Sequence, residues 1–214
     1  MTETRKAPAT ANRKTKRLCL DFANTVDWHA SDHPSEQLHN YDDLVLWAQG
    51  VGILTETKAH RLFSEAKHRP GDATKVLKRA IALREATYSV FSAVVRDRPP
   101  RGSDLAILNA ELAQALGRLQ VTRAGENFAW RWTGDEAALD RILWQVARSA
   151  ADLLTSEDLW RVGECADDRG CGWLFLDVSR NRSRRWCDMK DCGNRAKAKR
   201  HYHRKRIQTR KETR

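Results

Sequence analysis

The sequence lacks any long uncharged apolar segment, which excludes a membrane-spanning helix of the usual length of about 20 residues. Its first residues are polar and basic and include no apolar stretch, so we expect no secretory signal. These absences predict a cytoplasmic protein without a membrane partner. In that reducing compartment, the five cysteines are expected as thiols or metal ligands and not as disulfides.

Acidic residues are scarce at the C-terminal end of the chain. From Ser179 to Arg214, three Asp or Glu stand against fifteen Lys or Arg, a net charge of +12, whereas residues 1–178 carry a net charge of −1. A charge excess confined to one end indicates a polyanionic partner, with association with the nucleoid as its cellular consequence. Charge alone leaves a solubilising tail as an equal alternative.

Catalytic residue patterns are also missing. Some nucleases use a zinc-finger scaffold with a histidine base, but no histidine occurs between Cys165 and Cys192. We see no Ser, Cys or carboxylate triad elsewhere in the chain. The sequence therefore predicts that the protein is not an enzyme.

The N-terminal part of the chain is predicted to be mainly α with a small β-hairpin, an α+β domain over residues 17–158. Residues 1–16 lack apolar periodicity and are predicted to form a disordered basic arm. Apolar residues recur at helical intervals in five later segments, namely 41–49, 55–67, 72–96, 104–116 and 135–154. Alternation over 119–123 and 127–133 predicts the hairpin. Asn40, Thr55 and Ser103 are the expected helix N-caps.

Four cysteines form two close pairs, Cys165 with Cys171 and Cys187 with Cys192. The pairs have the spacings C-x5-C and C-x4-C and are separated by fifteen residues, which suits four thiolates around one structural Zn²⁺. Residues 173–178 read as a strand that turns and returns through 184–186, and a helix is expected after Cys192. A knuckle, a hairpin and then a helix is the order of a treble-clef finger.

Two other interpretations of the cysteines stay open. The gaps are wider than the usual two residues, so the cysteines could be buried without a metal. Alternatively, His201 or His203 replaces one of them as a ligand. On a straight helix His201 would lie about 13 Å beyond Cys192, too far to share the metal.

The C-terminal motif resembles a known zinc finger. The string WCDMKDCGNR at 186–195, followed by AKAKRH, is similar to the CGNR zinc finger, as are residues 171–177 and 179–181. The gap between the first two cysteines is about one residue longer than is usual in that family. The resemblance assigns residues 159–206 to the finger with its basic helix and leaves 207–214 as a basic tail.

Upstream segments resemble the ABATE domain that usually precedes this finger. Residues 18–26 are similar to the start of that domain, and 41–47 and 147–154 to further parts of it. The resemblance covers residues 17–206 and implies a bacterial transcription regulator that binds DNA. RNA binding by an accessory protein and a zinc-dependent protein-interaction module remain alternatives. A homodimer is compatible with each of these functions.

Basic residues of the finger are the candidates for nucleic-acid contact. Most are expected to position phosphates, with Arg195 or Arg200 as the candidates for reading a guanine edge. A structural role that braces the finger is an equal alternative for Arg195. The full set is Arg180, Arg182, Arg184, Arg185, Arg195, Lys197, Lys199, Arg200, Arg204, Lys205 and Arg206.

Polar residues interrupt the apolar segment 18–28 and need partners. One hypothesis is a pocket for a small-molecule effector that includes Asn24, Arg84 and Arg148. The alternative is a set of internal hydrogen bonds and ion pairs. The loop with His29, His33 and His39 is either a second metal site or solvated.

Overall fold

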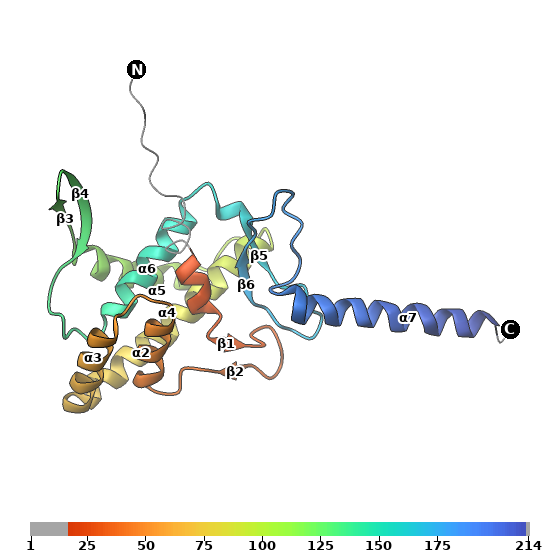
Figure 1. The fold of residues 1–214 in the computed structure, drawn as a ribbon, viewed down its shortest axis with the longest axis horizontal. Helices are drawn as coiled ribbons and strands as arrows, with labels where there is room; N and C mark the ends of the chain where they lie inside the picture. Colours follow the sequence, from red (N-terminus) through yellow and green to blue (C-terminus); the bar gives the residue numbers. More distant parts are fainter. Residues whose placement is uncertain (1–16, 213–214) are drawn as a thin grey trace, which may run out of the picture.

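The computed structural model describes residues 17–212, in which helices alternate with three pairs of short antiparallel strands (Figure 1). The predicted basic arm over residues 1–16 lies outside the described residues. A short helix over residues 17–23 is followed by the longer helices α2 (Tyr41–Gly50), α3 (Glu56–His68), α4 (Pro70–Val95), α5 (Gly102–Leu116), α6 (Arg141–Leu154) and α7 (Asn194–Glu212). No helix within residues 17–212 is both long and apolar enough to cross a membrane.

The strands form three separate pairs, each made of two strands that follow one another in the chain. β1 (Val26–Asp27) pairs with β2 (Ser35–Glu36), and β3 (Leu119–Ala124) pairs with β4 (Asn127–Trp132). A 3₁₀ turn, η1 (Leu159–Arg161), leads into β5 (Val162–Glu164), which pairs with β6 (Leu174–Leu176). A π-helical turn, η2 (Met189–Gly193), precedes α7. The predicted mainly α architecture with a small hairpin is confirmed.

Local sequence signals set the starts of the first helices. The Asn40 side chain accepts a hydrogen bond from the Asp43 N–H at 3.0 Å, and the Asp43 carboxylate accepts one from the Asn40 N–H, a reciprocal cap of α2. Thr55 caps α3 through the Lys58 N–H. α4 begins at Pro70, two residues before the predicted start, because proline fits the first helical position.

Two predicted helix starts are wrong. Ser103 lies inside the first turn of α5, and Arg101 takes the N-cap position without a side-chain hydrogen bond. α6 begins at Arg141 and not at Asp135. The Asp135 carboxylate accepts a hydrogen bond from the Ala137 N–H at 2.8 Å, which closes a turn that competes with the helix.

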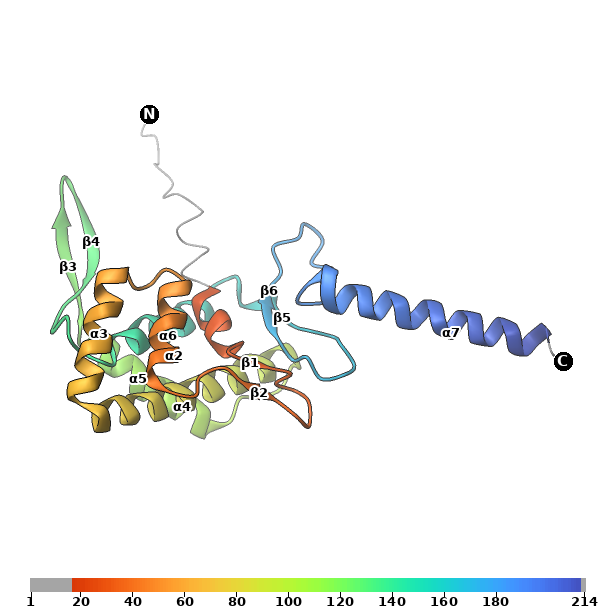
Figure 2. The same ribbon diagram turned by 60° about the horizontal axis from the view of Figure 1, so that its bottom comes forward.

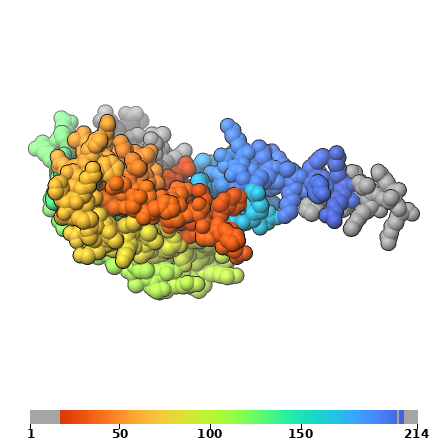
Figure 3. Space-filling model, turned by 90° about the horizontal axis from the view of Figure 1, so that it is seen from below, coloured from red at the N-terminus to blue at the C-terminus, as the bar shows by residue number. Residues whose placement is uncertain are grey.

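The β3–β4 hairpin forms as predicted, but its turn has two residues and not three, because Ala124 belongs to β3. Ala124 lies opposite Asn127, and Gly125 takes a φ of 62°, which is left-handed backbone that suits glycine. Figures 1 and 2 show this hairpin and α7 extending from different ends of the helical body. In the space-filling view α7 also stands clear of the body (Figure 3).

One hydrophobic core joins the helices to the strand pair β5–β6. It contains large side chains of the N-terminal segment and of α2, α3, α4 and α6, including Phe22, Leu44, Leu62, Leu83 and Ile142. Val162, Leu174 and Leu176 belong to the same cluster of buried side chains. The strands that flank the first cysteine pair are therefore part of the main core.

The predicted return strand at 184–186 does not form. β6 pairs instead with β5, which precedes the first cysteine. The buried Asp177 carboxylate accepts hydrogen bonds from the Ser179 N–H at 2.8 Å and the Arg184 N–H at 3.0 Å, so the chain turns before a second ladder can form. Burial alone would raise the pKa of Asp177, but these donors and the Arg184 charge hold it below its ordinary value.

Candidate metal centre and nucleic-acid interface

The four cysteines of the two predicted pairs lie together. Cys165 and Cys171 are in the loop between β5 and β6, Cys187 follows the Asp177 turn, and Cys192 is in η2. All four are free thiols, and their sulfur atoms lie within 4.8 Å of one another. The Sγ atoms of Cys171 and Cys187 are 3.7 Å apart, and those of Cys187 and Cys192 are 3.5 Å apart. Four sulfurs around Zn²⁺ at about 2.3 Å would be separated by about 3.8 Å, so the cluster fits one zinc ion.

The acid–base behaviour of the thiols also fits a bound cation. Contacts with the Cys165 and Cys171 sulfurs raise the pKa of Cys187, and burial raises the pKa of Cys192. Four neighbouring thiols cannot all ionise unless a cation offsets their charge. A divalent metal supplies that charge, and four cysteine ligands make a closed, structural site.

No histidine joins this cluster among the described residues. The only group there of three or more side chains close enough to hold a metal consists of the four cysteines. α7 is unbroken from Asn194 to Glu212, which carries His201 away from the sulfurs. His29 pairs with Glu85 at 2.8 Å, so the structure does not gather His29, His33 and His39 into a second metal site.

Arg195 braces the metal centre. Its Nη2 donates a hydrogen bond to the Cys192 Sγ at 2.8 Å, and its Nε donates to the Asp167 carboxylate at 3.1 Å. Its Nη1 pairs with Asp191, and its guanidinium lies 5.2 Å from the centre of the Trp28 ring. Of the two roles expected for Arg195, the geometry places this side chain in the bracing role.

Two aspartates between the first cysteines hold the start of α7. Burial alone would raise the pKa of Asp167, but the Arg169 N–H and the Arg195 guanidinium hold it below its ordinary value. Asp168 pairs with Lys199. These two aspartates were not among the predicted site residues. Their position between Cys165 and Cys171 could have indicated a role beside the metal centre.

The N-terminal segment forms a platform for the cysteine loop. The Cys171 carbonyl accepts a hydrogen bond from the His29 N–H at 3.2 Å, and the Gly170 carbonyl accepts one from the Ala30 N–H at 3.1 Å. Trp28 is flanked by Arg195 and by Arg169, whose guanidinium lies 5.0 Å from its ring centre. Sequence reasoning missed Trp28, because nothing local to residue 28 indicates a contact with the finger.

The three residues of the hypothesised effector pocket have separate surroundings. Asn24 exchanges hydrogen bonds with the backbone of Leu174 in β6. Arg84 is buried and donates two hydrogen bonds to the Glu36 carboxylate, at 2.6 and 2.7 Å. The structure does not bring Asn24 and Arg84 together with Arg148, which lines a different cavity.

The predicted arginines before Cys187 differ in their contacts. Arg184 donates hydrogen bonds to the carbonyls of Trp186 and Cys187 and lies over Phe175, so it supports the finger from within. Arg182 stacks on Trp160 at 3.7 Å from the ring centre. Arg180 and Arg185 are exposed.

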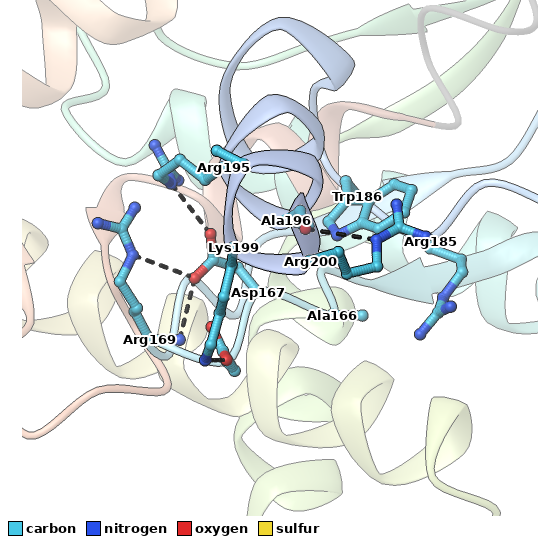
Figure 4. Close-up of a pocket in the computed structure, with 11 residues that line it drawn as sticks. Ala166, Asp167, Arg169, Arg185, Trp186, Arg195, Ala196, Lys199 and Arg200 are labelled. Atoms are coloured by element: carbon cyan, nitrogen blue, oxygen red, sulfur yellow. Dashed lines mark hydrogen bonds and ion pairs between the residues drawn. The ribbon is translucent and has the colours of Figure 1, made fainter. Parts of the chain in front are cut away.

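A groove runs between the cysteine loop and the first turns of α7 (Figure 4). Its volume is about 660 Å³. On one side Trp186 lies between Arg185 and Arg200, whose guanidinium carbons are 5.4 and 5.9 Å from its ring. On the other side Asp167, Arg169 and Lys199 line it. The groove thus combines an aromatic ring with cations at the base of α7.

The remaining predicted contacts lie along α7. The exposed cations of this helix among the candidates are Lys197, Lys199, Arg200, Arg204, Lys205 and Arg206. The backbone of α7 continues through Glu212, so residues 207–212 of the predicted tail are helical.

Comparison with known proteins gives two matches that follow one another along the chain. A model of the ABATE family, described as a putative stress-induced transcription regulator, matches residues 16–157. A model of the CGNR zinc finger matches residues 161–205, which include all four clustered cysteines. No curated protein matches the chain.

Proposed function

The chain belongs to the ABATE family and carries a CGNR zinc finger, and on that premise we propose that it regulates transcription by binding double-stranded DNA through α7. The zinc ion holds the base of this helix and takes no part in a reaction. Its four positions are filled by cysteines, so no position is open for a substrate or water. The proposed function is therefore non-catalytic.

The observation that supports this proposal best is the composition and exposure of α7. The helix has 19 residues and is about 28 Å long. From Asn194 to Arg206 it carries seven Lys or Arg and no acidic residue. Cations spaced four residues apart, such as Arg200 and Arg204, destabilise an isolated helix, and a polyanion removes that repulsion.

Duplex DNA suits this helix better than duplex RNA. The major groove of B-form DNA is about 12 Å wide and admits an α-helix. The major groove of A-form RNA is deep and narrow and excludes one. The small Ala196 and Ala198 in the first turns would let the backbone approach a groove, and Arg185 and Arg200 would contact phosphates beside Trp186.

The contacts at the base of α7 divide basic residues of the finger into two groups. Arg195 and Lys199 are paired with aspartates of the finger, and Arg184 with its backbone carbonyls. We assign these three to holding the helix in position. Arg200, Arg204 and Arg206, further along α7, are assigned to DNA.

Titration of a labelled DNA duplex with the zinc-loaded protein at several salt concentrations tests this assignment. The logarithm of the affinity should fall with the logarithm of salt concentration, with a slope of about 0.9 for each phosphate contacted. The variant R200Q/R204Q/R206Q should bind at least 10-fold more weakly, with a slope smaller by about 2–3. The matched control K67Q/R98Q/R101Q removes three exposed cations from the N-terminal domain and should leave both values unchanged.

Three outcomes would contradict the proposal. The α7 variant could bind DNA as well as the unchanged protein. A structured RNA could bind more tightly than the duplex at matched salt. Finally, genome-wide mapping could show equal, sequence-specific occupancy by the tagged protein and by its C187S/C192S variant, which would exclude the finger as the DNA-binding element.

A further inference from the structure

A second cavity lies where the start of the helix over residues 17–23, the turn after α2, the middle of α6 and the end of β4 meet. Its volume is about 620 Å³, within the range of pockets that hold small organic ligands. Leu18, Ile53 and Trp132 give it an apolar lining. It shares no lining residue with the groove beside α7.

The β3–β4 hairpin extends this apolar lining outward. In the observed register Val121 lies opposite Trp130, and Arg123 opposite Phe128, so these side chains share one face with Trp132. Val121 is 57% exposed, Trp130 63% and Phe128 75%, although each is apolar. An exposed aromatic face next to a cavity indicates a surface that an apolar molecule can cover.

Arg148 supplies a positive charge in the same place. Its Nε donates to the Asp152 carboxylate at 2.7 Å, and its guanidinium lies 5.6 Å from the centre of the Trp130 ring. These contacts hold the side chain at the cavity wall and leave its two terminal amino groups without a hydrogen-bond partner among the described residues. Arg17 adds a second cation and Asp21 one anion, so the lining carries a net positive formal charge.

From this juxtaposition we infer that the cavity binds a small amphipathic organic anion, a monocarboxylate with an aromatic or aliphatic body. The carboxylate would accept hydrogen bonds from the terminal amino groups of Arg148, which match its two oxygens. The apolar body would lie against Leu18, Ile53 and Trp132, with Trp130 covering its exposed side.

The position of the cavity connects it to the metal centre. The helix over residues 17–23 begins at the cavity, and the chain that follows it reaches Asn24, which is hydrogen-bonded to β6. Four residues later Trp28 contacts Arg195 of the zinc finger. An anion that shifts the start of this helix would therefore act on the element that carries the finger. This regulatory consequence rests on the proposed function, whereas binding of the anion does not.

Calorimetric titration of the full-length, zinc-loaded protein with phenylacetate and with octanoate tests the inference. Both acids should bind, and the uncharged amides, phenylacetamide and octanamide, should bind at least 10-fold more weakly. The variant R148Q should lose at least 10-fold in affinity for the acids. The control R131Q removes an exposed arginine from the opposite, polar face of the same hairpin and should bind them as the unchanged protein does. Circular dichroism of both variants verifies that each is folded.

Several results would overturn the inference. The first is that neither acid gives a heat of binding at millimolar concentration. The second is that acid and amide bind equally well, and the third is that folded R148Q keeps full affinity for the acids. Tighter binding of phenylalanine than of phenylacetate would instead indicate that Asp21 binds an ammonium group and that the ligand of the site is a zwitterion. A dimer that forms without any acid and depends on Phe128 and Trp130 would assign the aromatic face to a second copy of the chain. Because these titrations contain no DNA, a failure of DNA binding leaves their result intact.

Discussion

Asn24 and Leu174 are 150 residues apart in the chain and exchange two hydrogen bonds of 2.9 Å. The Asn24 side-chain amide donates to the Leu174 carbonyl, and its oxygen accepts from the Leu174 N–H. One side chain thus supplies β6 with the pairing that another strand would otherwise provide. The contact joins the zinc finger to the N-terminal segment.

Replacement of Asn24 by alanine should therefore lower the stability of the whole chain. Both polar groups of Leu174 would lose their partner beside the core, and the free energy of unfolding should fall by about 1–3 kcal/mol. Urea unfolding followed by circular dichroism measures the change. Asn109→Ala, on the exposed side of α5, is the control and should leave the midpoint nearly unchanged. Equal midpoints for both variants would show that the two hydrogen bonds contribute nothing.

Arg195→Gln should weaken zinc binding while leaving all four cysteines in place. The hydrogen bond to the Cys192 sulfur and the ion pair with Asp167 would both be lost. Loss of such outer contacts typically lowers metal affinity by about 10–100-fold. Competition with a chromophoric chelator measures the affinity, and Lys197→Gln in the same turn of α7 is the control. A zinc affinity equal to that of the control variant would remove Arg195 from the metal centre.

Gly172→Ala should separate the cysteine loop from its platform. Gly172 has a φ of 68°, and an added Cβ would come within 2.8 Å of Ala30 and of the Tyr88 hydroxyl. Strained backbone and this overlap together should lower the free energy of unfolding by about 1–3 kcal/mol. Gly71→Ala is the matched control, because Gly71 has open space around it and lies in the first turn of α4. An equally stable Gly172→Ala protein would contradict the close approach of the two segments.

The ion pair between Glu36 and Arg84 predicts a dependence of stability on pH. Burial alone would raise the pKa of Glu36, but hydrogen bonds and charge from Arg84 outweigh it and hold the pKa below the ordinary value of 4.5. A lowered carboxyl pKa stabilises the folded state at neutral pH, and this contribution disappears as the pH falls through the folded value, below 4.5.

Glu36→Gln isolates this contribution. At neutral pH the variant should be less stable by about 1–2 kcal/mol, because the buried Arg84 charge loses one of its two carboxylate partners and keeps Glu85. The difference from the unchanged protein should shrink as the pH is lowered from 7 to about 3. Urea unfolding across this range measures it, with Glu126→Gln in the exposed hairpin turn as the control. A difference that is the same at every pH would exclude the ion pair as its source.

Elements with local signals could be predicted from the sequence. Asn40 and Thr55 cap the helices expected of them, because capping depends on residues within one turn. The hairpin turn at Gly125 follows from the same kind of signal. The cysteine cluster could be predicted because a metal needs four ligands at suitable spacings, whatever the surrounding fold.

Features that depend on distant segments could not be predicted in this way. β5 has only three residues, too few for a periodic pattern, and its pairing with β6 is fixed by the shared core. The contact of Trp28 with Arg195 crosses most of the chain. Asp167 and Asp168 are easily seen in the sequence between two metal-binding cysteines. Only the folded loop shows that they pair with Arg195 and Lys199.

The shared core has a consequence for how this protein can be rearranged. A graft of residues 159–206 onto another scaffold would leave Leu174 and Leu176 facing water and would separate Arg195 from Trp28. A working transplant would have to carry the segment from Leu18 to Glu36 as well, although the family matches divide the chain between these parts. For protein engineering, the two matched regions therefore have to be transferred together and cannot be exchanged separately.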